Sequence, residues 1–167
     1  MSGIANYCPD EVSVLLAGFI PASGFIEGTF VDISKDTPPF SSVVSPDGTV
    51  SRLYNDNSVY TIALTLMSTS DTNDALTKLW QLDEITQRGK FPLLIKDKSG
   101  SDLFFSTTTW IEGLPGIVKT ETIEGRTWIL KSSQAVINIG GNAEPSGIIN
   151  DLVNTAVSAL PSLRGIL

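Results

Sequence analysis

The chain has 167 residues, a formal net charge of −7, one cysteine and no histidine. This length suits one domain with a small appendage. The missing histidine excludes a Ser-His-Asp triad, a Cys-His pair and His-bearing zinc sites, and the single Cys8 excludes an internal disulfide. The sequence has no cluster of basic residues, which argues against a nucleic-acid-binding surface. We expect neither a signal peptide nor a transmembrane helix, because no suitable apolar run is present.

The N-terminal third predicts β-structure. Residues 11–20 and 25–33 are strand-like and flank a Pro-Ala-Ser-Gly turn, so residues 11–33 predict a β-hairpin. Residues 34–46 are expected to form an irregular stretch. Its Phe40, Val43 and Val44 are too apolar for a solvated loop, which favours contact with another chain. Asp47-Gly48 is a hairpin turn signal before a short strand at 50–54.

The centre of the chain predicts a strand followed by a helix. In residues 60–66, Tyr60, Ile62, Leu64 and Leu66 alternate with Thr61, Ala63 and Thr65, as in a strand with one buried face. Ser70 or Asp71 is expected to cap a helix over residues 71–88, which ends near Arg88-Gly89. The apolar stripe of this helix comprises Ala75, Leu76, Leu79, Leu82 and Ile85.

Further strands are predicted beyond the helix. Residues 91–96 and 103–110 flank an Asp97–Gly100 turn, and residues 117–123 and 126–132 flank Glu124-Gly125. A last strand covers residues 134–139. We therefore assign residues 1–142 to a β domain and residues 143–167 to a C-terminal extension.

The extension predicts an amphipathic helix over residues 147–160, which Pro161 ends. Its apolar positions are Ile148, Ile149, Leu152, Val153, Ala156, Val157 and Leu160. Such a helix needs a partner surface, either on its own domain or on a neighbouring chain.

No motif points to catalysis. Gly140-Gly141 lacks the lysine and the helix of a phosphate loop, and Asp71 and Asp74 suit helix capping better than calcium binding. Glu112, Glu121 and Glu124 form no specific glycosidase pattern. We expect Trp80, Trp110 and Trp128 in the core or at an interface rather than in a sugar-binding surface. We expect no catalytic residue, no metal site and no cofactor.

Several segments follow an order and spacing that resemble the tail tube proteins of contractile-tailed bacteriophages. They are Asp10-Glu-Val, Gly24-Phe-Ile-Glu-Gly-Thr-Phe, Asp47-Gly48 with Arg52, Thr61-Ile-Ala-Leu-Thr-Leu, Ser70-Asp-Thr-Asn-Asp-Ala-Leu, Phe91-Pro92, Asp97-Lys-Ser-Gly100, Trp110-Ile111, Arg126-Thr-Trp-Ile-Leu130 and Gly140-Gly141-Asn142. The resemblance covers about residues 7–142. Pro46 departs from the small residue usual before the Asp-Gly turn.

The resemblance implies a mainly β fold with one central α-helix, built as two packed antiparallel sheets or a flattened β-barrel. It implies a virion structural protein: hexameric rings, whose inner sheets join into one barrel, stack into a tube through which the genome passes. Phe40, Val43 and Val44, with Ile148, Ile149, Leu152, Val153, Ala156 and Leu160, are then expected at subunit interfaces. Glu27, Asp32, Thr61, Ala63 and Thr65 are expected to face the lumen.

The expected partners are other copies of the chain, the tail sheath, the baseplate, the tail terminator, the tape-measure protein in the lumen and passing DNA without specific binding. Assembly would take place in the bacterial host cytoplasm, with no membrane anchoring. A tube-initiator or baseplate hub ring, a secreted type VI secretion tube component and, more remotely, a carbohydrate-binding β-sandwich remain alternatives.

Overall fold

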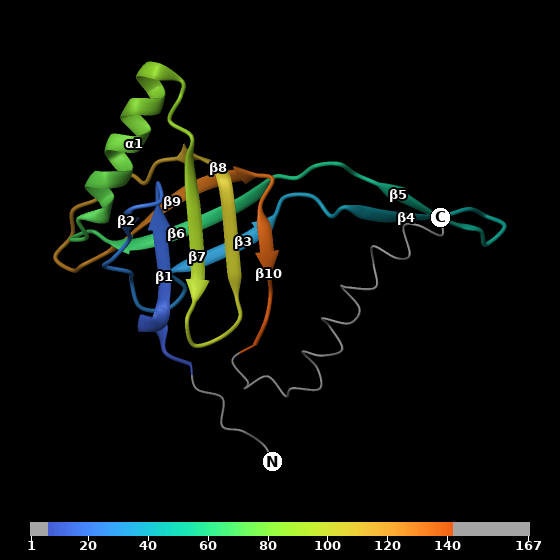
Figure 1. The fold of residues 1–167 in the computed structure, drawn as a ribbon, viewed down its shortest axis with the longest axis horizontal. Helices are drawn as coiled ribbons and strands as arrows, with labels where there is room; N and C mark the ends of the chain where they lie inside the picture. Colours follow the sequence, from blue (N-terminus) through green and yellow to red (C-terminus); the bar gives the residue numbers. More distant parts are fainter. Residues whose placement is uncertain (1–6, 142–167) are drawn as a thin grey trace, which may run out of the picture.

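The computed structural model describes residues 7–141. The predicted helix at 147–160 therefore lies outside the described residues. The elements, shown in Figure 1, are the 3₁₀ helix η1 (Pro9–Glu11), β1 (Val12–Leu16), β2 (Ile20–Pro21), β3 (Val31–Lys35), β4 (Phe40–Val44), β5 (Val50–Tyr54), β6 (Tyr60–Met67), α1 (Thr72–Thr86), β7 (Phe91–Asp97), β8 (Leu103–Gly113), β9 (Gly125–Ser133) and β10 (Val136–Asn138). The expectation of a mainly β fold with one α-helix is confirmed for this part of the chain.

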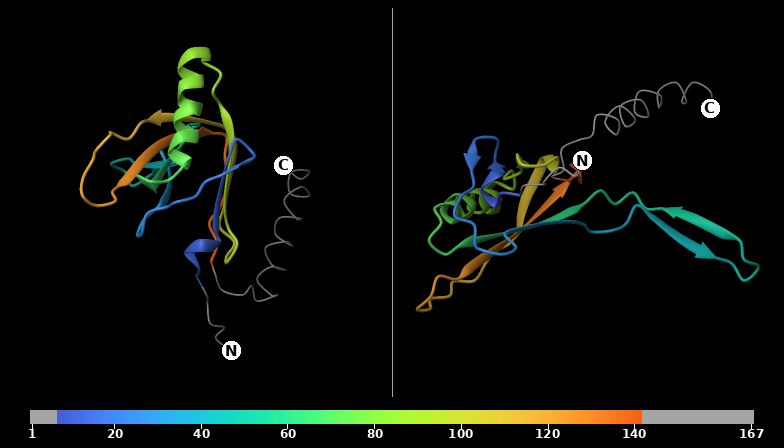
Figure 2. Two further views of the ribbon diagram at one scale, coloured as in Figure 1. Left: turned by 90° about the vertical axis from the view of Figure 1, so that its left-hand side faces the viewer. Right: turned by 90° about the horizontal axis from the view of Figure 1, so that it is seen from below.

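The strands form two antiparallel sheets. The larger sheet has eight strands in the order β2-β1-β7-β8-β9-β6-β3, with β10 paired to β8. The smaller sheet is the β4–β5 hairpin, which projects far from the rest of the molecule (Figure 2). Two sheets were expected, but they do not pack face to face, because the second is this projecting hairpin.

The larger sheet bends across the long strand β8. Leu103–Phe105 at the start of β8 pair with β10, whereas Thr108–Gly113 pair with β9. Register shifts occur in β8 near Ile111 and in β7 near Phe91, and such bulges bend strands. Among the described strands, β2 and β3 end the sheet and do not pair with each other. The expectation of a closed β-barrel is therefore wrong for the single chain.

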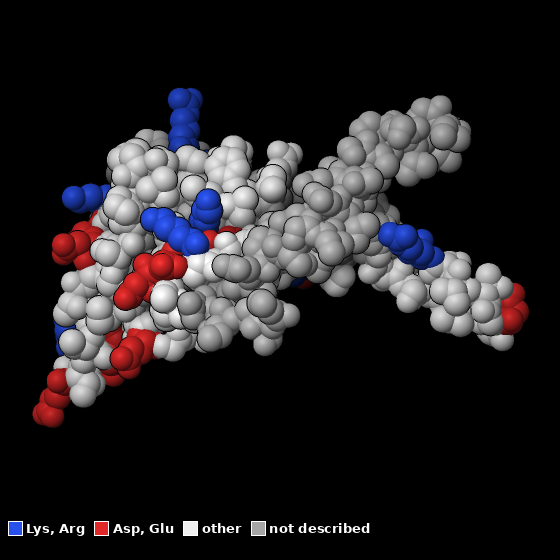
Figure 3. Space-filling view, turned by 60° about the horizontal axis from the view of Figure 1, so that its bottom comes forward, with Lys and Arg blue, Asp and Glu red and all other residues white. Residues whose placement is uncertain are grey.

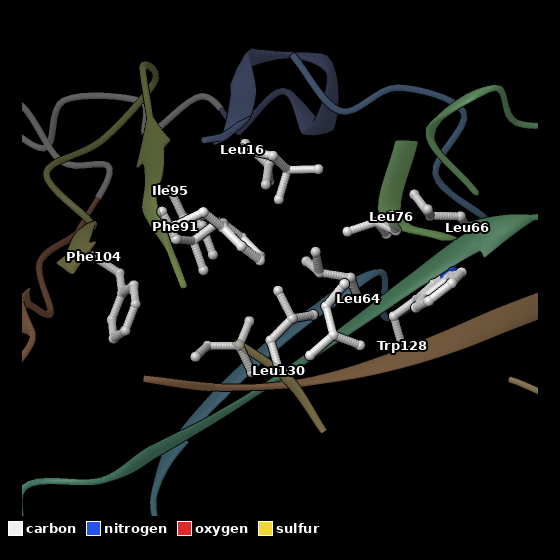
Figure 4. Close-up of a cluster of buried hydrophobic side chains, with 13 residues drawn as sticks. Leu16, Leu64, Leu66, Leu76, Phe91, Ile95, Phe104, Trp128 and Leu130 are labelled. Atoms are coloured by element: carbon white, nitrogen blue, oxygen red, sulfur yellow. The ribbon is translucent and has the colours of Figure 1, made fainter. Parts of the chain in front are cut away.

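The core lies between the two parts of this bent sheet and one end of α1 (Figure 4). Its buried side chains are Val14, Leu16, Ile62, Leu64, Leu66, Leu76, Phe91, Leu93, Ile95, Phe104, Ile111, Trp128 and Leu130. Ile62, Leu64 and Leu66 are fully buried, as the alternation in β6 predicts. Each such side chain contributes about 1.5–3 kcal/mol relative to an exposed one.

The N-terminal end of α1 is anchored by polar contacts. The Ser70 hydroxyl accepts the Thr72 backbone N–H over 3.2 Å, while the Asp71 side chain makes no capping bond. The Asn73 side-chain amide donates to the backbone oxygens of Met67 and Ser70 over 2.9 and 3.0 Å. The helix ends two residues earlier than predicted, at Thr86, because Gln87 takes a left-handed conformation with φ 56°.

The predicted apolar stripe of α1 is only partly used. Leu76 is fully buried and Leu79 packs against the core, but Leu82 and Ile85 are 51 % and 82 % exposed. Figure 1 shows the second half of the helix standing clear of the sheet. Helical spacing therefore predicted the core positions Leu76 and Leu79 correctly, but not the exposure of Leu82 and Ile85.

The predicted hairpin at 11–33 is wrong. Ala17 and Gly18 take left-handed conformations and turn the chain out of β1, so within residues 17–33 only the short strand β2 pairs with β1. The main partner of β1 is β7, and β3 pairs with β6. Local turn signals cannot reveal such long-range pairing.

Two other predicted segments also differ. Residues 34–46 are not irregular, because they hold the end of β3 and all of β4, although the Asp47-Gly48 turn joins β4 to β5 as predicted. Residues 117–123 form no strand and expose Ile117, Val118 and Ile123. β9 pairs instead with β8 and β6.

Candidate assembly surfaces

The β4–β5 hairpin, called the arm below (residues 40–54), is the most prominent surface feature. Its five cross-strand pairs are Phe40 with Tyr54, Ser41 with Leu53, Ser42 with Arg52, Val43 with Ser51, and Val44 with Val50. Asp47-Gly48 closes it: Gly48 has φ 86°, and the Asp47 carboxylate accepts the Thr49 backbone N–H over 3.0 Å. This bond holds the pKa of Asp47 below its usual range. The turn therefore defines the register of the arm.

Every residue of β4 and β5 is exposed. The large apolar side chains involved are Phe40, Val43, Val44, Val50, Leu53 and Tyr54, with exposed fractions from 45 % to 68 %. Figure 3 shows the arm as a mostly uncharged projection. An isolated two-stranded hairpin is marginally stable in water. This arm therefore needs a partner surface. Phe40, Val43 and Val44, which the sequence predicts at an interface, all belong to it, with Phe40 and Val44 on one face and Val43 on the other.

The two faces of the arm differ. Directly paired residues share a face of a hairpin, so Phe40, Tyr54, Val44 and Val50 lie on one side. The rings of Phe40 and Tyr54 are 5.5 Å apart, and the Arg52 guanidinium lies 3.4 Å from the centre of the Phe40 ring. Cation–π contact of this kind keeps the charged group on top of an apolar platform. The result is a face with an aromatic pair at one end and an aliphatic pair at the other, and with Ser42 and the cation Arg52 between them.

A second candidate surface is the face of β3, β6 and β9 that points away from the core. Asp32 pairs with Ala63, which pairs with Ile129 on its other side, and Thr61 and Thr65 lie on the same face of β6. Four of the five predicted lumen residues thus share one face. Glu27 does not, because it lies in the exposed loop before β3.

Most side chains of this face are short or polar, and Ile129 is a large apolar one among them. The Thr65 and Thr127 hydroxyls are 3.0 Å apart, within hydrogen-bonding distance. Lys131 Nζ lies 2.6 Å from an oxygen of Asp36 and donates to the Thr61 hydroxyl over 2.6 Å. Hydrogen bonds from Lys131 and then Thr61 hold the pKa of Asp36 below its usual range. The sequence did not indicate this network, because Asp36 and Lys131 are far apart in the chain and adjacent only through β-pairing.

The described residues contain no cluster of three or more His, Cys, Asp and Glu side chains that could hold a metal ion. No helix in residues 7–141 has the length and hydropathy needed to cross a membrane. Of the tryptophans, Trp128 is buried, and Trp80 packs against the core from α1.

Comparisons with known proteins complete the description. No protein-family model matches the chain. It is 30 % identical over 149 residues to "Structural protein ORF10" of Pseudomonas phage KPP10, covering 85 % of this chain and 86 % of that protein.

Solved structures share the fold at low sequence identity. The anti-feeding prophage tube-terminating cap matches with a TM-score of 0.58 and 12 % identity over 83 % of this chain and 94 % of that chain. A chain of the native gene transfer agent virion matches with a TM-score of 0.55 and 9 % identity over 80 % and 100 %. A sheath/tube terminator of an extracellular contractile injection system matches with a TM-score of 0.51 and 13 % identity over 80 % and 97 %.

Proposed function

This chain belongs to the family of phage structural proteins that includes Structural protein ORF10 of Pseudomonas phage KPP10, and on that basis we propose that it is the subunit of a phage tail tube. Family membership makes it a structural protein of the virion rather than an enzyme. In the proposal, copies of the chain form hexameric rings, and the rings stack into a hollow tube through which the genome leaves the particle.

The exposed arm is the observation that supports this proposal most strongly. A hairpin with six large apolar side chains in solvent would cause a monomeric protein to aggregate. In a protein that polymerises, the same side chains can form the contact between subunits. The arm of one copy would lie on a different surface of the next copy, which is a head-to-tail contact. Contacts of that type close into rings or continue as open-ended filaments.

The polar face of β3, β6 and β9 suits the inner wall of the tube. Its Thr61, Ala63 and Thr65 side chains are short, and Asp32 adds negative charge next to Ala63. A ring of six chains, each with a charge of −7, would carry about −42. A wall of that sign repels DNA phosphates, so DNA would pass without specific binding. Glu27 would contribute to this charge from the loop before β3.

The proposal also names partners. Other copies of the chain come first, through ring and stacking contacts. The tail sheath would surround the tube, the baseplate and a tail terminator would close its two ends, and the tape-measure protein would occupy the lumen during assembly.

A tube-terminating cap is the second candidate function. The structures of the anti-feeding prophage cap and of the injection-system terminator share the fold of this chain. A cap also forms a ring, but its rings do not continue to stack. An initiator or hub ring is expected to behave in the same way.

Electron microscopy of the purified full-length protein separates these functions. The tube-subunit proposal predicts long tubes of uniform width at high protein concentration. Isolated rings would assign the protein to a cap or initiator instead. A chain that stays monomeric at millimolar concentration would contradict both.

A further inference from the structure

A groove lies at the open side of the bent sheet. Its volume is about 520 Å³, and it runs between β3 on one side and β1, β7 and β10 on the other. The apolar lining includes Val12, Phe30, Ile33, Ile95, Phe104 and Ile137. Asp32, Asp97 and Asp102 add carboxylates to the lining. The groove is therefore a mainly apolar trough with three carboxylates in its lining, and the core does not fill it.

Free strand edges border this groove. β3 pairs only with β6, and β10 pairs only with β8, among the strands of residues 7–141. Apolar side chains also stand open at its mouth: Ile139 is 84 % and Tyr7 is 59 % exposed. Proteins usually cover such edges with a helix or loop, because they otherwise attract strands of other chains. Nothing in the described part of the chain covers this one.

The described chain ends at the same place. Ile139 lines the groove, and Gly141 is the last described residue. The next residues, 142–147, are the polar linker sequence NAEPSG, and the apolar positions start at Ile148. Seven residues reach at most roughly 23–25 Å. A tether of this length holds the attached segment at a local concentration on the order of millimolar.

We propose that residues 148–160 of the same chain cover this groove and the free edge of β3, with Ile149, Leu152 and Val153 among the side chains that enter it. The segment has one charged residue, Asp151, so its apolar side can be buried without burying an ion. Tyr7 also lines the groove, so the preceding residues 1–6 are a second candidate occupant, but Ile4 is their only large aliphatic side chain apart from Met1, which is too little to fill it.

Hydrogen exchange on the full-length protein tests this proposal. The variant I149D/L152D places charges on the apolar side of the segment, and the matched control N154D places one on its polar side. The backbone amides of Val31–Lys35 should exchange about tenfold faster in I149D/L152D than in the parent or the control. Equal exchange in all three proteins would overturn the proposal, as would an increase of the same size in N154D.

Dilution distinguishes the chain's own segment from that of a neighbour. Protection of the Val31–Lys35 amides that is independent of protein concentration supports docking within one chain. Protection that disappears on dilution means that a second copy supplies the segment, and overturns the assignment to the same chain. At a concentration where the protein is monomeric, the comparison of I149D/L152D with the parent concerns single chains, so its outcome does not depend on whether the protein forms tubes.

Discussion

The indole N–H of Trp128 donates a hydrogen bond to the side-chain oxygen of Asn73 over 2.9 Å, and both residues are buried. This bond joins β9 to the first turn of α1. The Asn73 amide nitrogen is also used, by the backbone oxygens of Met67 and Ser70. One buried side chain thus connects the sheet, the helix and the turn between them.

Replacing Asn73 should therefore destabilise the fold. In N73L the indole N–H and two backbone oxygens lose their partner, and a buried unsatisfied polar group costs about 1–3 kcal/mol. Urea denaturation should show a loss of at least this size, whereas Q81A, at an exposed position on the same helix, should change stability by less than about 0.5 kcal/mol. The double variant N73L/W128F should lose less than the sum of the single losses, because the two side chains interact directly. Additive losses would contradict the proposed coupling.

The Asp36–Lys131 pair should make stability depend on pH in the acid range. The pKa of Asp36 is lowered in the folded state by Lys131 and Thr61 from an ordinary value of 3.8. A carboxyl group whose pKa is lower in the folded state stabilises the protein at pH values above its pKa in the unfolded state. This contribution disappears as the pH falls through the pKa of the folded state. D36N should thus be less stable than the parent at pH 7, and the difference should shrink below pH 3.8.

Urea midpoints measured across this range provide the check. In a K131M background the loss of stability caused by D36N at pH 7 should be smaller, because Lys131, the larger cause of the lowered Asp36 pKa, is absent. A difference between D36N and the parent that persists unchanged at the lowest pH would argue against this origin.

Two apolar residues of α1 should respond very differently to truncation. Leu76 is fully buried, so L76A should cost about 2–5 kcal/mol. Ile85 is 82 % exposed, so I85A should change the stability of the monomer by less than about 0.5 kcal/mol. Denaturation at a concentration where the protein is monomeric measures both. A large loss in I85A would mean that the second half of α1 is covered in the monomer.

The arm should control assembly without controlling folding. V44D would bury an unpaired charge in any contact the arm makes, at a cost of several kcal/mol. Each 1.4 kcal/mol lowers an association constant about tenfold, so sedimentation should show at least a tenfold smaller assembled fraction. V44T, which keeps the branched shape, is the matched control. The melting temperature of monomeric V44D should equal that of the parent, and normal assembly of V44D would exclude the arm as an interface.

Residue patterns in the sequence were sufficient to predict several elements. The alternation in residues 60–66 identified β6 and its buried face, and Asp47-Gly48 and Asp97–Gly100 identified two hairpin turns. These signals are local, since a strand with one buried face has a period of two and a tight turn needs particular residues. The same locality explains why Phe40, Val43 and Val44 stood out: their apolar character conflicts with exposure whatever the fold.

The wrong expectations concern pairing between distant segments. The main partner of β1 is β7 rather than the strand predicted at 25–33, and β8 pairs with β10 and β9 through different parts of its length. Whether an apolar residue is buried also depends on what lies above it, which is why Leu82 and Ile85 remain exposed on a helix that Leu76 anchors.

Composition and local pattern were therefore enough to establish a β-rich protein without a catalytic constellation and with an apolar segment at residues 40–44. Tertiary structure was needed to show that this segment belongs to a projecting arm, that Asp32, Thr61, Ala63 and Thr65 share one face, and that the sheet stays open along β3. The physical reason is that the pairing of strands depends on the burial of side chains across the whole sheet. A short stretch of sequence carries no information about that burial.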